Sequence, residues 1–279
     1  MNGPVSKYVT VLDRELHYME WGEAGRPKLV LWHGLARTGR DFDDLAEALG
    51  RRWRIVAPDT IGRGLSQWSP RPQAEYCLEF YAKLATAFLD AIGWETFDWV
   101  GTSMGGAIAI RAGAGPLAGR IRRLVLNDIG PELNPAAIER IRSYAGTPPR
   151  FERVSELEAY LRQIYLPYGY LSDAQWRRMA ETSARRLPDG GITTHYDPNM
   201  AMQFVHHPDD YAQWDAWRKL ACPMLCLRGA NSDLLLREAA ERMPKENALC
   251  RVVEIEGCGH APALNVPGQI ALVENFLTS

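Results

Sequence analysis

The stretch of this sequence whose residue types most directly suggest chemistry is residues 101–105 (GTSMG), a serine between two glycines. The apolar run 97–100 before it is typical of a buried strand, and the small apolar residues 106–110 after it are typical of a helix packed on a sheet. A G-x-S-x-G turn between a strand and a helix leaves no room for a Cβ at its flanking positions and lifts the serine hydroxyl above the sheet. Ser103 is therefore the candidate nucleophile, although the same pattern also occurs in ordinary glycine-rich turns.

A serine nucleophile needs a base, and His260 is the candidate. It follows the predicted strand 250–255 and the small residues 257–259, so we expect it on a loop at the carboxyl edge of the sheet. There it would take the serine proton during attack and return it to the leaving alcohol. Three of the six histidines, namely His195, His206 and His207, lack such a loop-after-strand setting.

The elements that must position these groups alternate between short apolar runs and helical patterns. The predicted strands are 8–12 and 16–21, which form an opening hairpin, and then 28–32, 53–57, 97–100, 121–126, 221–228 and 250–255. Helices are predicted from 41 to 49, from 79 to 92, after the serine turn, from 236 to 243, and at the end of the chain up to residue 277. The continuous apolar strands are typical of a sheet covered on both faces.

Composition excludes several classes of function. The 279 residues are 46% hydrophobic and 24% charged, which fits one α/β domain with an insertion. A net charge of −2 gives no basic surface for nucleic acid or an anionic membrane. The first residues contain no apolar signal segment, so we expect a cytoplasmic protein. Five cysteines without C-x-x-C spacing argue against a disulfide framework and against a zinc site.

Three motifs together resemble the α/β-hydrolase family: H-G at 33–34, D-x-x-G-x-G-x-S at 59–66, and G-T-S-M-G-G at 101–106. They follow one another at the separations usual in that family, and the resemblance covers nearly the whole chain. It implies an α/β fold with an eight-stranded, mostly parallel sheet flanked by helices, and a serine, an acid and a histidine in that order along the chain. Within this resemblance, His33 and Asp59 are expected to brace their loops.

The resemblance also implies the two remaining parts of the catalytic site. The oxyanion donors would be the N–H groups of Met104, after the nucleophile, and of Leu35, after the strand 28–32, with Ala36 as the fallback. Asp233 is the expected acid, because it stands in the G-x-x-S-D pattern of the family after the penultimate core strand. Asp128, at the end of strand 121–126, is the alternative, since some relatives supply the acid from there.

The segment 131–218 differs from the rest of the chain. It consists of helical stretches interrupted by prolines and glycines, and it resembles the helical cap of the family, inserted after the sixth strand. The expected domains are therefore a core of residues 1–130 and 219–279 and a cap of residues 131–218. The cap contains the candidates for the substrate pocket, which are Tyr165, Tyr168, Trp176, Met202 and Phe204. Aromatic and methionine side chains at helical spacing are more often core, so only a minority of them should touch substrate.

These features predict a serine esterase that hydrolyses a small-molecule carboxylic ester through an acyl-enzyme. No metal or cofactor is needed, because a histidine and an oxyanion hole handle the proton and the charge. Two other reactions share the same triad: cleavage of a C–C bond in a meta-cleavage-type diketone and opening of an enol-lactone. A ligand-binding receptor on the same fold is the alternative that is not an enzyme. A homodimer is left open by the sequence.

Overall fold

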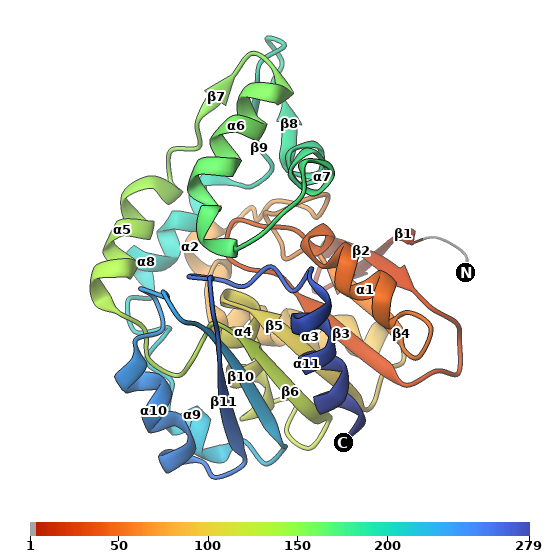
Figure 1. The fold of residues 1–279 in the computed structure, drawn as a ribbon. Coiled ribbons are helices and arrows are strands. Elements are labelled where there is room, and N and C mark those ends of the chain that lie inside the picture. Colours follow the sequence, from red (N-terminus) through yellow and green to blue (C-terminus); the bar gives the residue numbers. More distant parts are fainter. Residues whose placement is uncertain (1–3) are drawn as a thin grey trace.

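An eight-stranded sheet runs through the protein in the computed structural model, which describes residues 4–279 (Figure 1). The strand order is β1-β2-β4-β3-β5-β6-β10-β11. β2 is antiparallel to β1 and to β4, and the other neighbouring pairs are parallel. The strands are β1 (Val5–Val11), β2 (Arg14–Trp21), β3 (Lys28–Trp32), β4 (Arg54–Pro58), β5 (Phe97–Thr102), β6 (Ile121–Asn127), β10 (Met224–Gly229) and β11 (Cys250–Ile255). The predicted eight-stranded, mostly parallel sheet is confirmed. Residues 1–3 of the expected core lie outside the described residues.

The central strands read as continuous apolar runs because both of their faces are covered. In β3, Val30 and Trp32 belong to one hydrophobic cluster, whereas Leu29 and Leu31 belong to the cluster on the opposite face. All four side chains have no exposed surface. Because successive side chains of a pleated strand point to opposite faces, one continuous apolar strand contributes to the hydrophobic clusters on both faces of the sheet.

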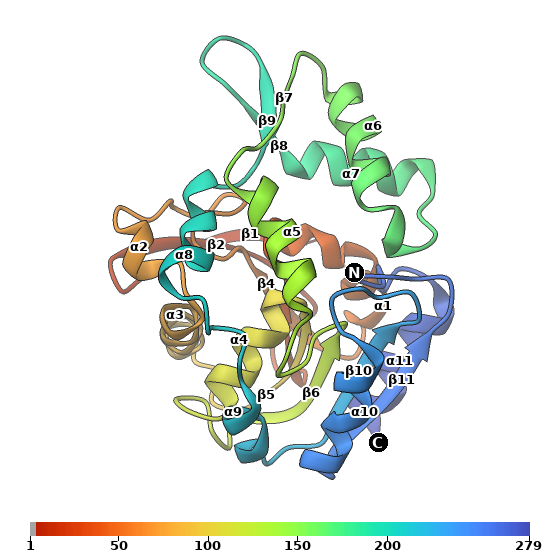
Figure 2. The same ribbon diagram turned by 90° about the vertical axis from the view of Figure 1, so that its left-hand side faces the viewer.

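Helices cover both faces of the sheet (Figures 1 and 2). α1 (Asp43–Leu49) and α11 (Pro267–Thr278) contribute to the cluster on one face, and α3 (Leu78–Ala91), α4 (Met104–Gly113) and α10 (Arg237–Glu246) contribute to the cluster on the other. Two short helices, η1 (Gly39–Phe42) and α2 (Pro72–Glu75), follow β3 and β4. The predicted helices 79–92 and 236–243 and the closing helix thus lie within a few residues of their observed bounds.

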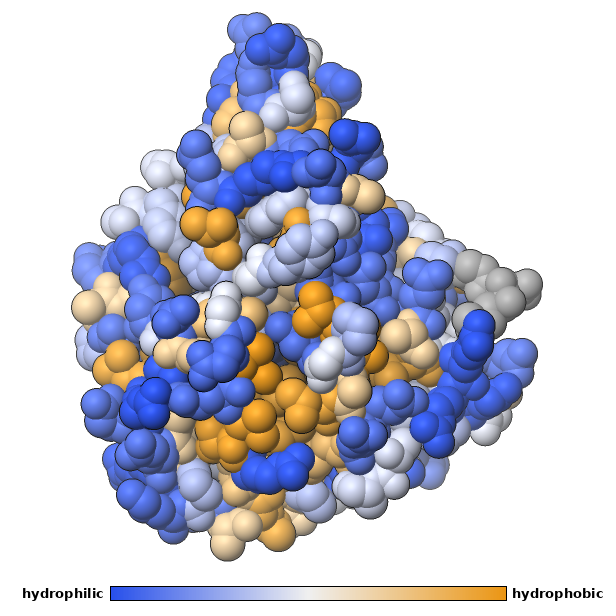
Figure 3. Space-filling view, in the orientation of Figure 1, coloured by the Kyte–Doolittle hydropathy of each residue, from blue (hydrophilic) through white to orange (hydrophobic). Residues whose placement is uncertain are grey.

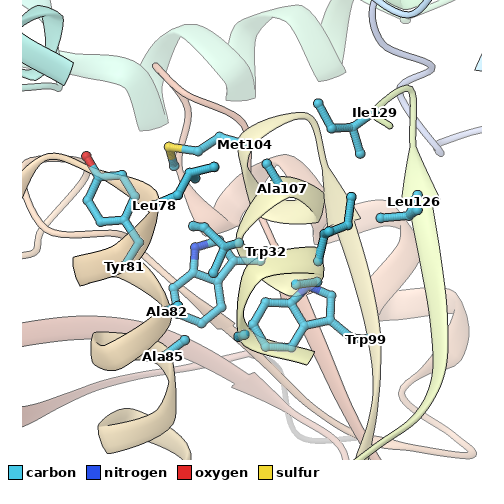
Figure 4. Packing of buried hydrophobic residues seen from close by; sticks show 14 of the residues in the cluster. Trp32, Leu78, Tyr81, Ala82, Ala85, Trp99, Met104, Ala107, Leu126 and Ile129 are labelled. Atoms are coloured by element: carbon cyan, nitrogen blue, oxygen red, sulfur yellow. The ribbon is translucent and has the colours of Figure 1, made fainter. Parts of the chain in front are cut away.

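Two stacked tryptophans support the turn from β5 to α4 (Figure 4). The rings of Trp32 and Trp99 are 5.1 Å apart between centroids and nearly parallel, at 4°. Trp99 also donates its indole N–H to the backbone oxygen of Gly105 in the first turn of α4, at 3.2 Å. The core beneath the serine turn is therefore tied to the helix that follows the serine.

Most of the segment between β6 and β10 stands over the carboxyl ends of the strands, whereas its last helix, α9 (Trp214–Lys219), lies at the other end of the molecule near α10 (Figures 1 and 2). Its elements are α5 (Pro135–Ala145), β7 (Arg150–Phe151), α6 (Val154–Ile164), η2 (Leu166–Tyr168), α7 (Asp173–Ser183), β8 (Ala184–Arg186), β9 (Ile192–Thr194), η3 (Pro198–Met202), α8 (Gln203–His206) and α9 (Trp214–Lys219). β7, β9 and β8 form a small antiparallel sheet, which the expectation of helices alone did not include. The β-branched run of β9, preceded by Gly190 and Gly191, favours a strand after a tight turn.

The inserted segment, residues 131–218, has its own small core. Leu157, Leu161 and Trp176 pack together with three other buried residues and are not part of the main clusters. The outer surface of this segment is largely hydrophilic, whereas apolar residues gather on the surface over the β11 edge of the sheet (Figure 3). Among the helices of residues 4–279, none has the length and apolar character needed to cross a membrane.

Candidate active site

Ser103 occupies the turn between β5 and α4 with a strained backbone. Its φ of 51° and ψ of −120° are unusual for a residue with a side chain. The flanking glycines are sterically required: a Cβ on Gly101 would lie 2.5 Å from Gly105 backbone atoms, and a Cβ on Gly105 would lie 2.0 Å from the Trp32 oxygen. The G-x-S-x-G pattern is therefore used as a tight strand-to-helix turn, and it presents Ser103 at the carboxyl edge of the sheet.

Three side chains from three different loops form a continuous hydrogen-bonded chain at this edge. His260 Nε2 lies 2.9 Å from Ser103 Oγ, and His260 Nδ1 lies 2.7 Å from Asp128 Oδ2. Because an ionised carboxylate only accepts, His260 carries its proton on Nδ1 and can accept the serine proton at Nε2. The predicted pairing of Ser103 with His260 is present in the structure.

Asp128 is fully buried and held by three donors. Besides His260, its carboxylate accepts hydrogen bonds from the Gly229 N–H at 2.8 Å and from the Ser232 hydroxyl at 2.5 Å. Its own backbone has a positive φ of 54° directly after β6. The donors satisfy the buried charge and fix the direction in which the carboxylate meets the imidazole.

The acid that contacts the histidine is thus Asp128, and the expectation of Asp233 is corrected. The side chain of Asp233 is half exposed and pairs with Arg140 of α5, away from His260. In the G-x-x-S-D turn it is the serine, Ser232, that reaches the site, through its bond to Asp128. The signal for Asp128 in the sequence was its position immediately after an apolar strand.

The two expected oxyanion donors lie on either side of Ser103. Met104 begins α4, and the loop after β3 passes so close to the nucleophile that a Cβ on Gly34 would lie 3.5 Å from the Ser103 Cβ. Within residues 4–279, neither the Leu35 N–H nor the Met104 N–H has a hydrogen-bond acceptor. Two free backbone donors beside a nucleophile, one of them at a helix N-terminus, are suited to binding a developing negative charge.

Buried side chains hold the loop after β3 in place. His33 donates Nδ1–H to the Gly34 oxygen at 2.7 Å and accepts at Nε2 from the Thr60 N–H at 2.9 Å. Burial lowers the pKa of His33 to about 4, because an imidazolium would be desolvated there. Asp59 accepts hydrogen bonds from the Gly39 N–H at 2.7 Å and from His17 at 2.8 Å. Both residues therefore brace the site, as the sequence predicted.

Known proteins with similar sequences and structures are hydrolases. The sequence profile described as "Alpha/beta hydrolase family" matches residues 29–271. The chain belongs to the alpha/beta hydrolase family. It is 39% identical over 273 residues to the 3-hydroxybutyrate-oligomer hydrolase of Cupriavidus necator, covering 94% of this chain and 92% of that protein. It is also similar to the pimeloyl-[acyl-carrier protein] methyl ester esterase of Xanthomonas campestris pv. campestris, at 29% identity over 88% of this chain and 92% of that one. Among solved structures, an alpha/beta hydrolase from Novosphingobium aromaticivorans superposes with a TM-score of 0.86 at 33% identity, covering 100% of this chain and 99% of that chain.

The structure of this hydrolase brings only some of the expected pocket residues to the site. The rings of Tyr165 and Tyr168 are 4.7 Å apart between centroids. Tyr168 also lines a small cavity of about 40 Å³ together with Thr102, the residue before Ser103, and Pro262, two residues after His260. Burial raises the pKa of both tyrosines, so their hydroxyls stay protonated and able to donate.

The other three pocket candidates lie elsewhere in the hydrolase. Trp176 is buried in the core of the inserted segment, and Phe204 stacks on Tyr211 within the main cluster at 6.5 Å between centroids. Met202 lies half-buried in η3 and does not line the cavity beside Thr102. Aromatic residues at helical spacing were thus mostly core, which is the common outcome for such patterns.

A buried arginine that the sequence did not reveal ties the loop after β3 to the inserted segment. Arg37 donates two hydrogen bonds to Asp41, at 2.8 and 2.5 Å, and one to Ser183 Oγ at 3.0 Å. Its guanidinium also lies 4.8 Å from the centre of the Tyr165 ring. Because Ser183 and Tyr165 belong to the inserted segment, this side chain connects that segment with the loop of Leu35.

The short helix η2 also connects the inserted segment with the site, through backbone hydrogen bonds to the loop that carries His260. The N–H groups of Gly259 and Ala263, on either side of His260, donate to the oxygens of Pro167 at 2.7 Å and Tyr168 at 3.1 Å. The inserted segment thus braces two of the loops that form the site.

Within residues 4–279, no group of three or more His, Cys, Asp or Glu side chains is arranged to hold a metal ion.

Proposed function

We propose that this hydrolase cleaves small-molecule carboxylic esters through an acyl-enzyme on Ser103. The observation that carries the proposal is the hydrogen-bonded chain from Ser103 through His260 to Asp128, at 2.9 and 2.7 Å. A nucleophile within hydrogen-bond distance of a base, which is itself oriented by a buried carboxylate, is the arrangement needed for acyl transfer.

The reaction would run in two halves. His260 Nε2 removes the proton from Ser103 Oγ as the oxygen attacks the ester carbon, and the carbonyl oxygen takes up the negative charge. As the tetrahedral intermediate collapses, the imidazolium gives its proton to the leaving alkoxide, so an alcohol departs and an acyl-enzyme remains. Water then repeats the same steps, releasing the carboxylic acid and restoring Ser103.

The proposed oxyanion donors are the Leu35 and Met104 N–H groups. Their support is the lack of any other acceptor within residues 4–279 and the close approach of the Leu35 loop to Ser103. A fixed backbone donor needs no reorganisation when charge appears on the substrate, and removing one such donor typically slows turnover by about 10²- to 10³-fold.

We further propose that residues 131–218 act as a cap over this site. Three observations support this role: most of the segment lies over the carboxyl ends of the strands, the part around α6 and α7 has its own small core, and contacts to Arg37 and to the His260 loop lie on two sides of the nucleophile. A cap of this kind would exclude water during acyl transfer and supply most of the substrate contacts.

For the substrate, we propose esters of short hydroxy acids, including oligomers of 3-hydroxybutyrate. The support is the relative that carries this activity in its name, at 39% identity over 94% of this chain. Such oligomers are chains of ester bonds, so the chemistry outlined above applies to them without change.

The direct test uses a fluorophosphonate probe and short p-nitrophenyl esters on the wild type and on Ser103→Ala. We expect the probe to label Ser103, and the substitution to abolish both labelling and ester turnover. A panel of 3-hydroxybutyrate oligomers, enol-lactones and ring-cleavage diketones would then identify the substrate class. A preference above about 10²-fold, or about 2.7 kcal/mol, is decisive. A wild type that is neither labelled nor active on any of these would contradict the proposal and favour the receptor alternative.

A further inference from the structure

Arg63, in the loop after β4, has a fully buried charge for which the triad mechanism has no use. Its exposed fraction is 0%. Within residues 4–279, no carboxylate lies within ion-pair distance of its guanidinium. The acid on the same loop, Asp59, makes its hydrogen bonds with His17, Gly39 and Leu65 instead. A buried and uncompensated cation is costly, so its presence needs an explanation beyond stability.

All acceptors of the guanidinium are neutral. Nε donates to the Leu35 oxygen at 2.8 Å, and Nη1 donates to the Ile61 oxygen and to the Tyr81 hydroxyl, both at 2.8 Å. The charge also lies 5.3 Å from the ring centres of Tyr76 and Tyr81. These contacts hold the planar fork in one orientation without cancelling its charge.

The same side chain touches both residues whose N–H groups are the proposed oxyanion donors. Nε bonds to Leu35, and Nη2 lies 3.7 Å from the sulfur of Met104. Figure 4 shows the Met104 side chain extending from the start of α4 toward Tyr81, which is another partner of Arg63. One guanidinium therefore lies against the two backbone segments that would bind the oxyanion.

We propose that Arg63 is a positioning residue for the oxyanion hole, an inference that rests on the ester hydrolysis proposed above. Its planar guanidinium fixes the loop of Leu35 relative to the start of α4, so that the N–H groups of Leu35 and Met104 keep their direction toward the position of the ester oxygen. Its positive charge is buried and has no carboxylate of residues 4–279 within ion-pair distance, so it favours the negative charge that develops on the ester oxygen. Arg63 itself does not touch substrate, and no bond is made or broken at its side chain.

The test compares the variants Arg63→Met and Arg63→Lys, with kcat corrected for the fraction of active sites that fluorophosphonate titrates. We expect kcat to fall about 100-fold in R63M, comparable to the loss of one oxyanion donor, and about tenfold in R63K, which keeps the charge but loses the fork. KM should change less than twofold, because the ester in its ground state carries no oxyanion. An aliphatic trifluoromethyl ketone, which forms a charged tetrahedral adduct with Ser103, should lose affinity by the same factors as kcat, whereas a methyl ketone of equal length should not.

The matched control is Arg14→Met. Arg14 is also a buried arginine, but Glu75 compensates its charge at 2.6 Å, and none of its hydrogen bonds reach the active-site loops. R14M should lower Tm yet leave the titrated kcat and the ketone affinities within twofold of wild type.

Two results would overturn the role of Arg63: a titrated kcat and a trifluoromethyl ketone affinity in R63M that match the wild type, or a loss explained wholly by fewer active sites. If R63M does not fold, R63K decides in the same way, because wild-type values in that variant contradict the need for the fork. Failure of the proposed function itself would already be visible as a wild type that neither hydrolyses esters nor binds the trifluoromethyl ketone.

Discussion

At the scale of single residues, the buried carboxylate of Asp128 determines how the histidine can act. It accepts hydrogen bonds from His260, Gly229 and Ser232, so it is a fixed acceptor opposite Nδ1. Only the tautomer with the proton on Nδ1 fits this arrangement, and that tautomer leaves Nε2 free to accept from Ser103. In the proposed mechanism, Asp128 thus selects the tautomer of His260 that can act as the base.

Replacing Asp128 by Asn should therefore lower kcat by about 10⁴-fold, because an amide that donates to Nδ1 stabilises the wrong tautomer. The matched control is Asp233→Asn, in which only a half-exposed pair with Arg140 is lost, so kcat should stay within about twofold of wild type. Steady-state kinetics on a p-nitrophenyl ester measures both. A larger loss in D233N than in D128N would show that the acid is assigned incorrectly.

His33 couples the stability of the site to pH. Its folded pKa of about 4 lies below the value near 6.5 in an unfolded chain, so as the pH falls the unfolded state takes up the proton first. The stability contributed by neutral His33 is complete above pH 6.5, is lost progressively down to about pH 4, and does not change further below that. The loss over the whole window is on the order of 3 kcal/mol.

Urea unfolding of wild type and His33→Gln at pH 7.0 and pH 4.5 tests this coupling. The stability advantage of the wild type over H33Q should shrink by about 2 to 3 kcal/mol at the lower pH, because glutamine has no proton to gain. The exposed His206 provides the control, since H206Q should follow the wild type at both pH values. An equal difference between wild type and H33Q at both pH values would contradict the prediction.

At the scale of elements, the sequence predicts a local structure well where the geometry of that structure depends on one element alone. The serine turn is an example, because Gly101 and Gly105 have no room for a Cβ whatever the rest of the chain does. The acid could not be chosen this way: the loops after β6 and β10 both end at the same edge of the sheet, and Asp128 and Asp233 differ only in where their side chains point. The contacts of Arg37 and η2 depend on how the inserted segment packs, which no periodicity encodes.

The contact of η2 with the histidine loop leads to a prediction for Gly169. This residue has a φ of 91° and a ψ of −149°, and a Cβ there would lie 2.7 Å from the Cys258 sulfur. Gly169→Ala should cost about 1 to 3 kcal/mol of stability and push the His260 loop away from Ser103, lowering kcat by about 10- to 100-fold. Kinetics and thermal unfolding of the same preparation separate the two effects.

Gly190 supplies the control for this experiment. Its φ of 87° is similarly positive, but a Cβ added at this turn between β8 and β9 would have no atom within 4 Å. G190A should lose about 1 kcal/mol of stability and keep its kcat. Equal kinetic losses in G169A and G190A would mean that backbone strain, and not the contact with the histidine loop, is responsible.

At the scale of the whole molecule, the hydrolase has hydrophobic cores of unequal size. The two clusters on either face of the sheet are extensive, and one of them includes buried residues of the inserted segment such as Phe204, Tyr211 and Trp217. The part of that segment around α6 and α7 has instead a separate core of six buried residues, and polar contacts attach it to the rest of the chain. Those attachments include Arg178 to Asp44 and Arg37 to Ser183. Because the buried residues of α6 and α7 form a cluster separate from those of the sheet, this part can open at a lower free energy than the whole chain unfolds.

Native-state hydrogen exchange should therefore find α6 and α7 less protected than β5 and β6, and Leu157→Ala should widen this gap. Leu157 is fully buried in the core of the inserted segment, so its truncation should cost about 2 to 5 kcal/mol there and leave the protection of β5 and β6 unchanged. Leu124→Ala in β6 removes an equally buried side chain from the main core, and it should lower protection in the sheet. If L157A reduced protection equally in α6 and in β5, the inserted segment and the sheet would form one cooperative unit, and opening of the proposed cap would require unfolding of the entire hydrolase.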